Sequence, residues 1–242
     1  MYDGHIKTIF FDLGETLIDT SISCKALNFG LKNVLSDKLV ADDELLLKWE
    51  KISSKICDQS SKKGEFYTVK KLQIISLENI LLEHNINLIE HKIIGIVNEF
   101  WRYFIKNCRL YEDVIPVLSR LTQECELGLI TNGDEEIVAG ILKRHNLNDF
   151  FKIKVISSVI KSYKPNRSLF EKALELAKCL PQEAIYVGDS AIDIYGAKKL
   201  GFITVIIHRK KTQDIMIKME PDFSIGSLLQ LYPIIKKVSR KS

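Results

Sequence analysis

The stretch of sequence at residues 185–197 reads IYVGDSAIDIYGA. It begins with an apolar run typical of a buried strand, ends that run at Asp189, and continues into a helix-like segment. The spacing of four residues places Asp193 in the first turn of that helix, facing back toward Asp189. One such pair could serve only to stabilise the turn and the helix N-terminus.

A second strand end of the same kind lies near the N-terminus, where residues 9–17 read IFFDLGETL. The apolar run ends at Asp12, and open α/β sheets bind ligands at the carboxyl ends of their strands. Two converging strand ends that carry carboxylates argue against a purely structural role. The carboxylates of Asp12, Asp189 and Asp193 suit a hard cation that keeps some of its waters, so this pattern predicts a Mg²⁺ site.

Several apolar runs predict further strands, and helical patterns separate them. Each run lacks polar alternation, which indicates strands covered on both faces. The alternation of strands and helices predicts an α/β fold, a Rossmann-like, doubly wound parallel sheet. The predicted strands are 6–11, 127–131, 153–156, 184–187 and 204–207, with a weaker one at 222–225. The predicted helices are 113–125, 135–145, 168–178, 192–200 and one that begins at Ser227.

The segment between residues 20 and 108 interrupts this alternation. It has helical periodicity throughout, and a connection of this length is too long for a loop. We therefore expect a helical-bundle cap of about four helices at 20–108, inserted into a catalytic core made of residues 1–19 and 109–242. A turn or loop within the cap is expected at 60–64, which reads SSKKG.

Two smaller features supply donors and a positive charge. Residues 129–133, LITNG, end a predicted strand at Thr131 and Asn132, where side-chain and backbone donors can hold a phosphate. Lys164 stands immediately before Pro165, which is well suited to start a helix. Each feature is weak by itself, because Thr-Asn-Gly is a common loop start and surface lysines are normally inert.

The sequence resembles the haloacid dehalogenase-like hydrolase superfamily in the order and spacing of four motifs. These are the strand ends at Asp12 and Asp189, the turn at Thr131 and Asn132, and the Lys164-Pro165 step. The resemblance extends over essentially the whole chain, and the Asp189 motif and the Lys164-Pro165 step are its most specific parts. It implies a Rossmann-like core with a helical cap between the first two motifs. It also implies that Asp12 is the nucleophile.

The resemblance further implies roles for the other site residues. Asp12, the Gly14 backbone carbonyl and Asp189 would be ligands of Mg²⁺, and Asp193 would bind through water or orient Lys164. Thr131 and Asn132 would hold the transferring phosphoryl group, and Lys164 would neutralise it, although Lys161 could compete for that role. The implied activity is phosphatase action on a small phosphorylated metabolite through an aspartyl-phosphate on Asp12.

Gly14 departs from the pattern of the superfamily's phosphatases, which usually carry a second aspartate, the general acid/base, at this position. General acid–base help is typically worth about 10²–10⁴-fold in rate. Glu15 is adjacent but is expected to point elsewhere. Two alternatives therefore remain open, a 2-haloacid dehalogenase and a weakly catalytic or non-catalytic protein that binds a phosphate ligand.

The composition is that of an ordinary globular protein, with 46% hydrophobic and 27% charged residues. A net charge of +4 is too small to argue for nucleic acid or a membrane surface. The basic runs at 209–211 and 236–241 are expected to be solvated. Five scattered cysteines and the absence of a signal-peptide pattern predict a cytoplasmic protein with reduced thiols. We expect a monomer or a homodimer.

Overall fold

The computed structural model describes residues 5–35, 39–209 and 219–239. The chain divides into two compact units. One consists of residues 1–19, 109–132 and 145–242, and the other of residues 20–108 and 133–144. The first, which we call the core unit, contains the sheet, and the second is the helical unit.

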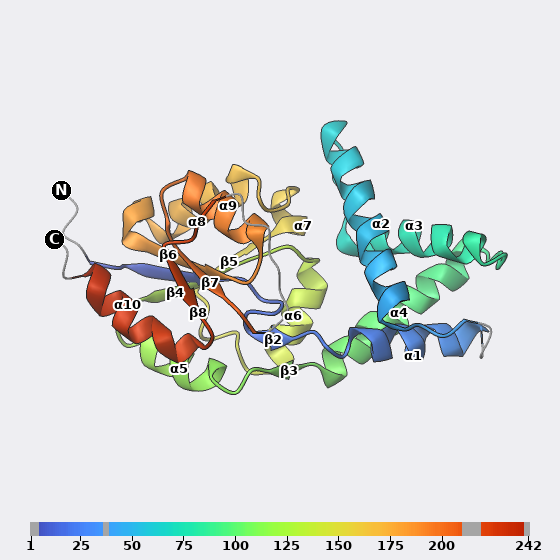
Figure 1. Cartoon of the computed structure of the whole chain (residues 1–242), viewed down its shortest axis with the longest axis horizontal. Coiled ribbons are helices and arrows are strands. Elements are labelled where there is room, and N and C mark those ends of the chain that lie inside the picture. Colours follow the sequence, from blue (N-terminus) through green and yellow to red (C-terminus); the bar gives the residue numbers. More distant parts are fainter. Residues whose placement is uncertain (1–4, 36–38, 210–218, 240–242) are drawn as a thin grey trace. The chain divides into compact units, whose positions relative to one another are not determined.

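Parallel strands form the sheet of the core unit (Figure 1), in the order β5-β4-β1-β6-β7-β8 over the described residues. The α/β fold predicted from the sequence is therefore confirmed. The strands are β1 (Thr8–Phe11), β4 (Glu126–Thr131), β5 (Ile153–Ile156), β6 (Ala184–Gly188), β7 (Ile203–Ile207) and β8 (Phe223–Ile225). All residues of β1 and β6 are buried, which is why these strands are apolar without alternation.

Helices cover both faces of this sheet. In Figure 1, α8 and α9 lie on one face, while α5 and α10 lie on the other. The helices and helical turns of the core unit are α5 (Val114–Leu121), α7 (Ser157–Ile160), α8 (Arg167–Ala177), η1 (Pro181–Glu183), α9 (Ala191–Lys199), η2 (Leu228–Gln230) and α10 (Leu231–Val238). Phe10, Phe170, Tyr186 and Phe202 pack together between the sheet and α8 and α9.

The register of the sheet determines where the site lies. Phe11, the last residue of β1, pairs with Leu129 of β4 and with Val187 of β6. The residues that follow these three strands therefore emerge at one edge of the sheet, as parallel strands require. Asp12, Thr131 and Asp189 come from sequence positions far apart and reach the same edge.

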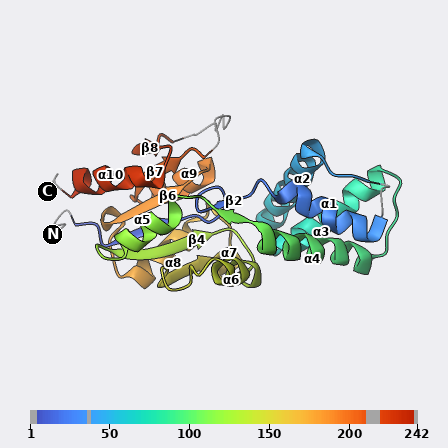
Figure 2. The same cartoon turned by 90° about the horizontal axis from the view of Figure 1, so that it is seen from below.

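The helical unit contains α1 (Ser23–Leu35), α2 (Asp43–Lys62), α3 (Val69–Glu83) and α4 (Glu90–Asn107), shown in Figure 2. An aromatic cluster of Trp49, Phe100, Trp101 and Phe104 fills its interior. The turn expected at 60–64 begins later than predicted, because α2 continues to Lys62 and Gly64 alone has a positive φ there, of 75°.

One segment differs from the division predicted from the sequence. Helix α6 (Glu135–Arg144) was expected in the core, but residues 133–144 belong to the helical unit. Gly140 lies against Ile105 of α4, and the buried carboxylate of Asp134 accepts hydrogen bonds from the backbone N–H groups of Val69 and Lys70 at 2.8 and 2.9 Å. These tertiary contacts have no local signature in the sequence.

A short antiparallel pair, β2 (Ile18–Asp19) and β3 (Arg109–Leu110), lies where the chain leaves and re-enters the core unit. Strands of two residues are too short for a periodic pattern, so the sequence did not predict them. No helix in the described part of the chain is both long and apolar enough to cross a bilayer.

Candidate active site

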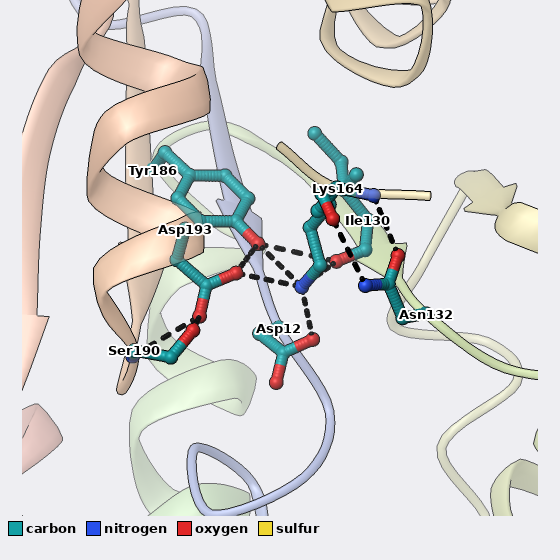
Figure 3. A network of polar contacts seen from close by, with 7 residues as sticks. All are labelled: Asp12, Ile130, Asn132, Lys164, Tyr186, Ser190 and Asp193. Atoms are coloured by element: carbon teal, nitrogen blue, oxygen red, sulfur yellow. Dashed lines mark hydrogen bonds and ion pairs between the residues drawn. The ribbon is translucent and has the colours of Figure 1, made fainter. Parts of the chain in front are cut away.

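A buried ion-pair network lies at the carboxyl edge of the sheet (Figure 3). The Nζ atom of Lys164 is 2.5 Å from Oδ1 of Asp12 and 2.7 Å from Oδ1 of Asp193. The Lys164 side chain is only 3% exposed, so its charge is almost entirely removed from water. Burying an unpaired ammonium would cost several kcal/mol, and the two carboxylates offset that cost.

Asp193 lies in the first turn of α9, as the sequence predicted, and both of its carboxylate oxygens are engaged. Oδ1 accepts from Lys164 and from the hydroxyl of Tyr186 at 2.8 Å, whereas Oδ2 accepts from the hydroxyl of Ser190 at 2.5 Å. A Cβ at Gly188 would lie 2.6 Å from Cβ of Asp193, so only glycine allows this close approach. The geometry suits Asp193 to orienting Lys164.

Asn132 holds the backbone of Lys164. Its side-chain oxygen accepts from the backbone N–H of Lys164 at 2.8 Å, and its side-chain nitrogen donates to the Lys164 carbonyl at 3.4 Å. The Asn132 carboxamide therefore positions the lysine. Lys161, the competing lysine, is exposed at the end of α7, so the ammonium next to Asp12 belongs to Lys164.

The carboxylates of this site are crowded. Burial raises the pKa of Asp189 to about 8, and the neighbouring charges of Asp12 and Asp193 contribute to the increase. Burial also raises the pKa of Asp12, although Lys164 opposes that shift. Burial lowers the pKa of Lys164, but the two carboxylates outweigh it, so the pKa lies above its ordinary value and the lysine stays protonated.

The same residues fit a divalent cation. One carboxylate oxygen from each of Asp12, Asp189 and Asp193 lies within 4.8 Å of the other two. With every group ionised, three carboxylates and one ammonium leave a surplus of two negative charges, which a divalent ion would neutralise. Oxygen donors are the ligands that Mg²⁺ prefers. The backbone carbonyl of Gly14, two residues after Asp12, is a further oxygen donor.

One member of this network, Tyr186, was not identified from the sequence. The Tyr186 hydroxyl lies 3.1 Å from Nζ of Lys164 and donates to Asp193. A tyrosine within an otherwise aliphatic buried strand was the available signal, because a buried hydroxyl needs a partner. Glu15 has a φ of 49°, and its carboxylate accepts from the hydroxyl of Tyr111 at 2.7 Å. Thr131 is buried at the end of β4.

The parallel sheet defines a Rossmann-like α/β fold. The site at its carboxyl edge combines an aspartate after the first strand, a buried lysine and a carboxylate cluster, which is typical of a hydrolase. Residues 9–207 match the family described as haloacid dehalogenase-like hydrolase, and the chain belongs to this family. The resemblance inferred from the sequence is thereby confirmed.

The relatives that match nearly the full length of the chain include phosphatases of two kinds. A glyceraldehyde 3-phosphate phosphatase of Methanopyrus kandleri is 28% identical, over 97% of this chain and 99% of its own. A pyrophosphatase, PpaX, of Bacillus cereus is 26% identical, over 97% of this chain and 99% of its own.

Solved structures share the fold. The HAD-hydrolase YfnB from Bacillus subtilis, bound to magnesium, superposes with a TM-score of 0.75 at 20% identity, over 96% of this chain and 99% of its own. L-2-haloacid dehalogenases have the same fold.

Proposed function

We propose that this chain is a Mg²⁺-dependent phosphatase that removes phosphate from a small phosphorylated metabolite, with Asp12 as nucleophile. The observation that carries the proposal is the Lys164 ammonium 2.5 Å from Asp12, beside the carboxylates of Asp189 and Asp193. A nucleophilic carboxylate next to a fixed positive charge suits attack on an anionic phosphoryl group. The named phosphatase and pyrophosphatase relatives support the same activity.

The chemistry has two steps. An oxygen of Asp12 attacks phosphorus, the bond to the leaving oxygen breaks, and that oxygen departs with its electron pair and takes a proton from solvent. Water then attacks the phosphorus of the aspartyl-phosphate, which releases inorganic phosphate and restores the carboxylate. Lys164 neutralises charge on the phosphoryl oxygens, and Thr131 and the backbone N–H of Asn132 hold the group.

Mg²⁺, when bound, supplies further charge neutralisation at the phosphoryl oxygens. Asp12, Asp189 and the Gly14 carbonyl would hold the ion. Both oxygens of Asp193 accept hydrogen bonds from protein groups, so this residue would orient Lys164 or reach the ion through water.

A 2-haloacid dehalogenase is the second candidate, because Gly14 lacks the acid/base carboxylate that phosphate chemistry normally uses and because dehalogenases share the fold. Displacement of a halide needs no metal, however. A haloacid anion would also have to approach three carboxylates that one ammonium only partly neutralises. These charges favour the phosphatase, in which Mg²⁺ accompanies the anionic substrate.

The test is hydrolysis of p-nitrophenyl phosphate by the wild type, by Asp12→Asn and by the wild type with EDTA. This substrate has a good leaving group, so it tolerates the missing acid at Gly14. We expect Mg²⁺-dependent release of phosphate, lower by at least about 10³-fold in Asp12→Asn. Asp149→Asn, at an exposed aspartate, should keep full activity.

Halide release from 2-chloropropionate is measured in parallel. Release that depends on Asp12 and is unaffected by EDTA would replace the phosphatase with the dehalogenase. If a folded wild type with Mg²⁺ shows neither activity, the proposal that remains is a protein that binds a phosphate ligand.

The setting of this activity is also proposed. We infer a cytoplasmic protein, supported by five free cysteines, acting as a monomer or a homodimer on a small molecule rather than on nucleic acid.

A further inference from the structure

The catalytic turn, which we define as residues 12–18, has an internal hydrogen-bond framework. The backbone N–H groups of Leu17 and Ile18 both donate to the Leu13 carbonyl at 3.0 Å, and Glu15 N–H donates to the Ile18 carbonyl at 2.8 Å. Glu15 has a left-handed φ of 49°, which costs a non-glycine residue about 1–2 kcal/mol. Contacts outside the turn must therefore help to maintain its shape.

Arg209 provides such a contact from the opposite end of the sequence. Its Nε and Nη2 atoms both donate to the Thr16 carbonyl, at 3.1 and 2.7 Å. Its Nη1 atom donates to Oδ2 of Asp113 at 2.8 Å. The arginine side chain is 5% exposed, so the basic run at 209–211 is not solvated at this residue, and Lys210 and Lys211 lie outside the described residues.

Other groups hold Asp113 and Arg209 in place. Oδ2 of Asp113 also accepts from the Ser227 hydroxyl at 2.7 Å and from the Leu228 backbone N–H at 2.8 Å. The guanidinium lies 4.1 Å from the ring centroid of Tyr111, whose hydroxyl donates to Glu15. Tyr111 and Arg209 thus contact consecutive residues of the catalytic turn. We call Tyr111, Asp113 and Arg209 the turn clamp.

We propose that Arg209 is a positioning residue for the reaction, because it holds the Thr16 carbonyl and so keeps Asp12 and the Gly14 carbonyl in productive geometry. This inference rests on the proposed phosphatase function. The planar fork of arginine reaches Thr16 and Asp113 together, whereas the single ammonium of a lysine is a point charge without that fork. A misplacement of about 1 Å in a catalytic group can lower a rate about 10²-fold.

The first test compares Arg209→Lys with the wild type in p-nitrophenyl phosphate hydrolysis. We expect kcat to fall about 10- to 100-fold, because the turn carries the nucleophile. KM should stay within about twofold, because substrate-holding groups on other strands are untouched. Asp222→Asn is the matched control. Like Asp113, Asp222 accepts hydrogen bonds from a cation, a hydroxyl and a backbone N–H. The cation is the Lys198 ammonium, and Thr204 supplies the other two donors, so none of these partners belongs to the catalytic turn.

Chemical rescue separates positioning from general stability. Arg209→Ala leaves space beside a groove of about 620 Å³ lined by Tyr111, Asp113 and Arg209, through which a small cation can enter. We expect a sub-denaturing concentration of guanidinium chloride to restore part of kcat, and sodium chloride of equal ionic strength to restore none.

Hydrogen exchange gives a readout that needs no activity. In Arg209→Lys, the amides of Glu15, Leu17 and Ile18 should exchange about tenfold faster, which Asp222→Asn should not reproduce. Unchanged exchange at these amides, or a loss of kcat equal to that of Asp222→Asn, overturns the inference. If the wild type hydrolyses no phosphate ester, the proposed phosphatase function is wrong. Faster exchange in Arg209→Lys would still show that Arg209 holds the catalytic turn.

Discussion

Lys164 combines a structural and a chemical role in one side chain. Its ammonium joins the residue that follows β1 to a residue of α9, since it contacts both Asp12 and Asp193. These carboxylates keep its pKa above the ordinary value despite burial, so the lysine is a fixed positive charge and cannot act as a general base at neutral pH. The burial that makes it effective toward a phosphoryl group also makes its removal costly to folding, because the carboxylates would lose their partner.

At the same scale, Gly14 determines which chemical step is slow. With no carboxylate at this position to activate water, hydrolysis of the aspartyl-phosphate should limit turnover, and p-nitrophenol should appear in a burst. Gly14→Asp should abolish the burst and raise steady-state kcat by at least about tenfold.

The control for this prediction is Gly14→Asn, which has nearly the same shape as the aspartate but cannot accept a proton. Pre-steady-state kinetics of all three proteins distinguish the outcomes. An equal gain in the asparagine variant, or no gain with aspartate, would contradict the assignment of general acid–base chemistry to this position.

At the scale of elements, close approach between α8 and α9 sets the position of the site's carboxylate helix. A Cβ at Gly196 of α9 would lie 2.3 Å from Cε2 and 2.7 Å from Cζ of Phe170, which is fully buried. Gly196→Ala must therefore push the two helices apart. We expect a loss of about 1–3 kcal/mol in the free energy of unfolding, measured by urea titration, and a lower kcat because Asp193 moves with α9.

Gly95→Ala is the matched control, since this glycine also lies inside a helix, α4, and the added Cβ would meet no heavy atom within 4 Å apart from its chain neighbours and the backbone of its own helix. Helix propensity alone should make that variant more stable, by up to about 1 kcal/mol. The same substitution thus has opposite signs in two helices. Equal effects in both would show that contact with Phe170 is unimportant.

At the scale of the whole molecule, the carboxylate cluster belongs entirely to the core unit. Mg²⁺ should therefore raise the unfolding temperature of that unit and leave the transition of the helical unit unchanged. Saturation at about a hundredfold excess over Kd corresponds to about 2.7 kcal/mol. Calorimetry with Mg²⁺ and with EDTA tests this, and a single transition that shifts as a whole would contradict it.

The pH dependence of this stabilisation follows from Asp189. Its pKa is raised from 3.8 to about 8, so the contribution of Asp189 to stability is fully present below the lower value and is lost progressively until pH reaches about 8. Mg²⁺ binds the ionised form, so the affinity for Mg²⁺ should increase by up to about tenfold per pH unit below that value and level off above it. The stabilisation by Mg²⁺ should therefore be larger one unit above this pKa than one unit below it.

Features encoded locally were predictable from the sequence. The strands of the core are apolar runs because both faces are covered, and their ends are marked by Asp12, Thr131 and Asp189. Once a parallel sheet is inferred, these strand ends must share one edge, so most of the candidate site followed from topology alone. Asp193 was predictable for the same reason, because its distance from Asp189 is fixed by one helical turn.

Contacts between residues far apart in the chain were decided only by the tertiary structure. Arg209 precedes two lysines and resembles a solvated basic run, yet it is buried against Thr16, 193 positions earlier. The pairing of Tyr111 with Glu15 and the packing of α6 on α4 are equally invisible in local patterns. Periodicity records which residues are buried, whereas the partner of a buried polar group depends on how the elements are arranged in space.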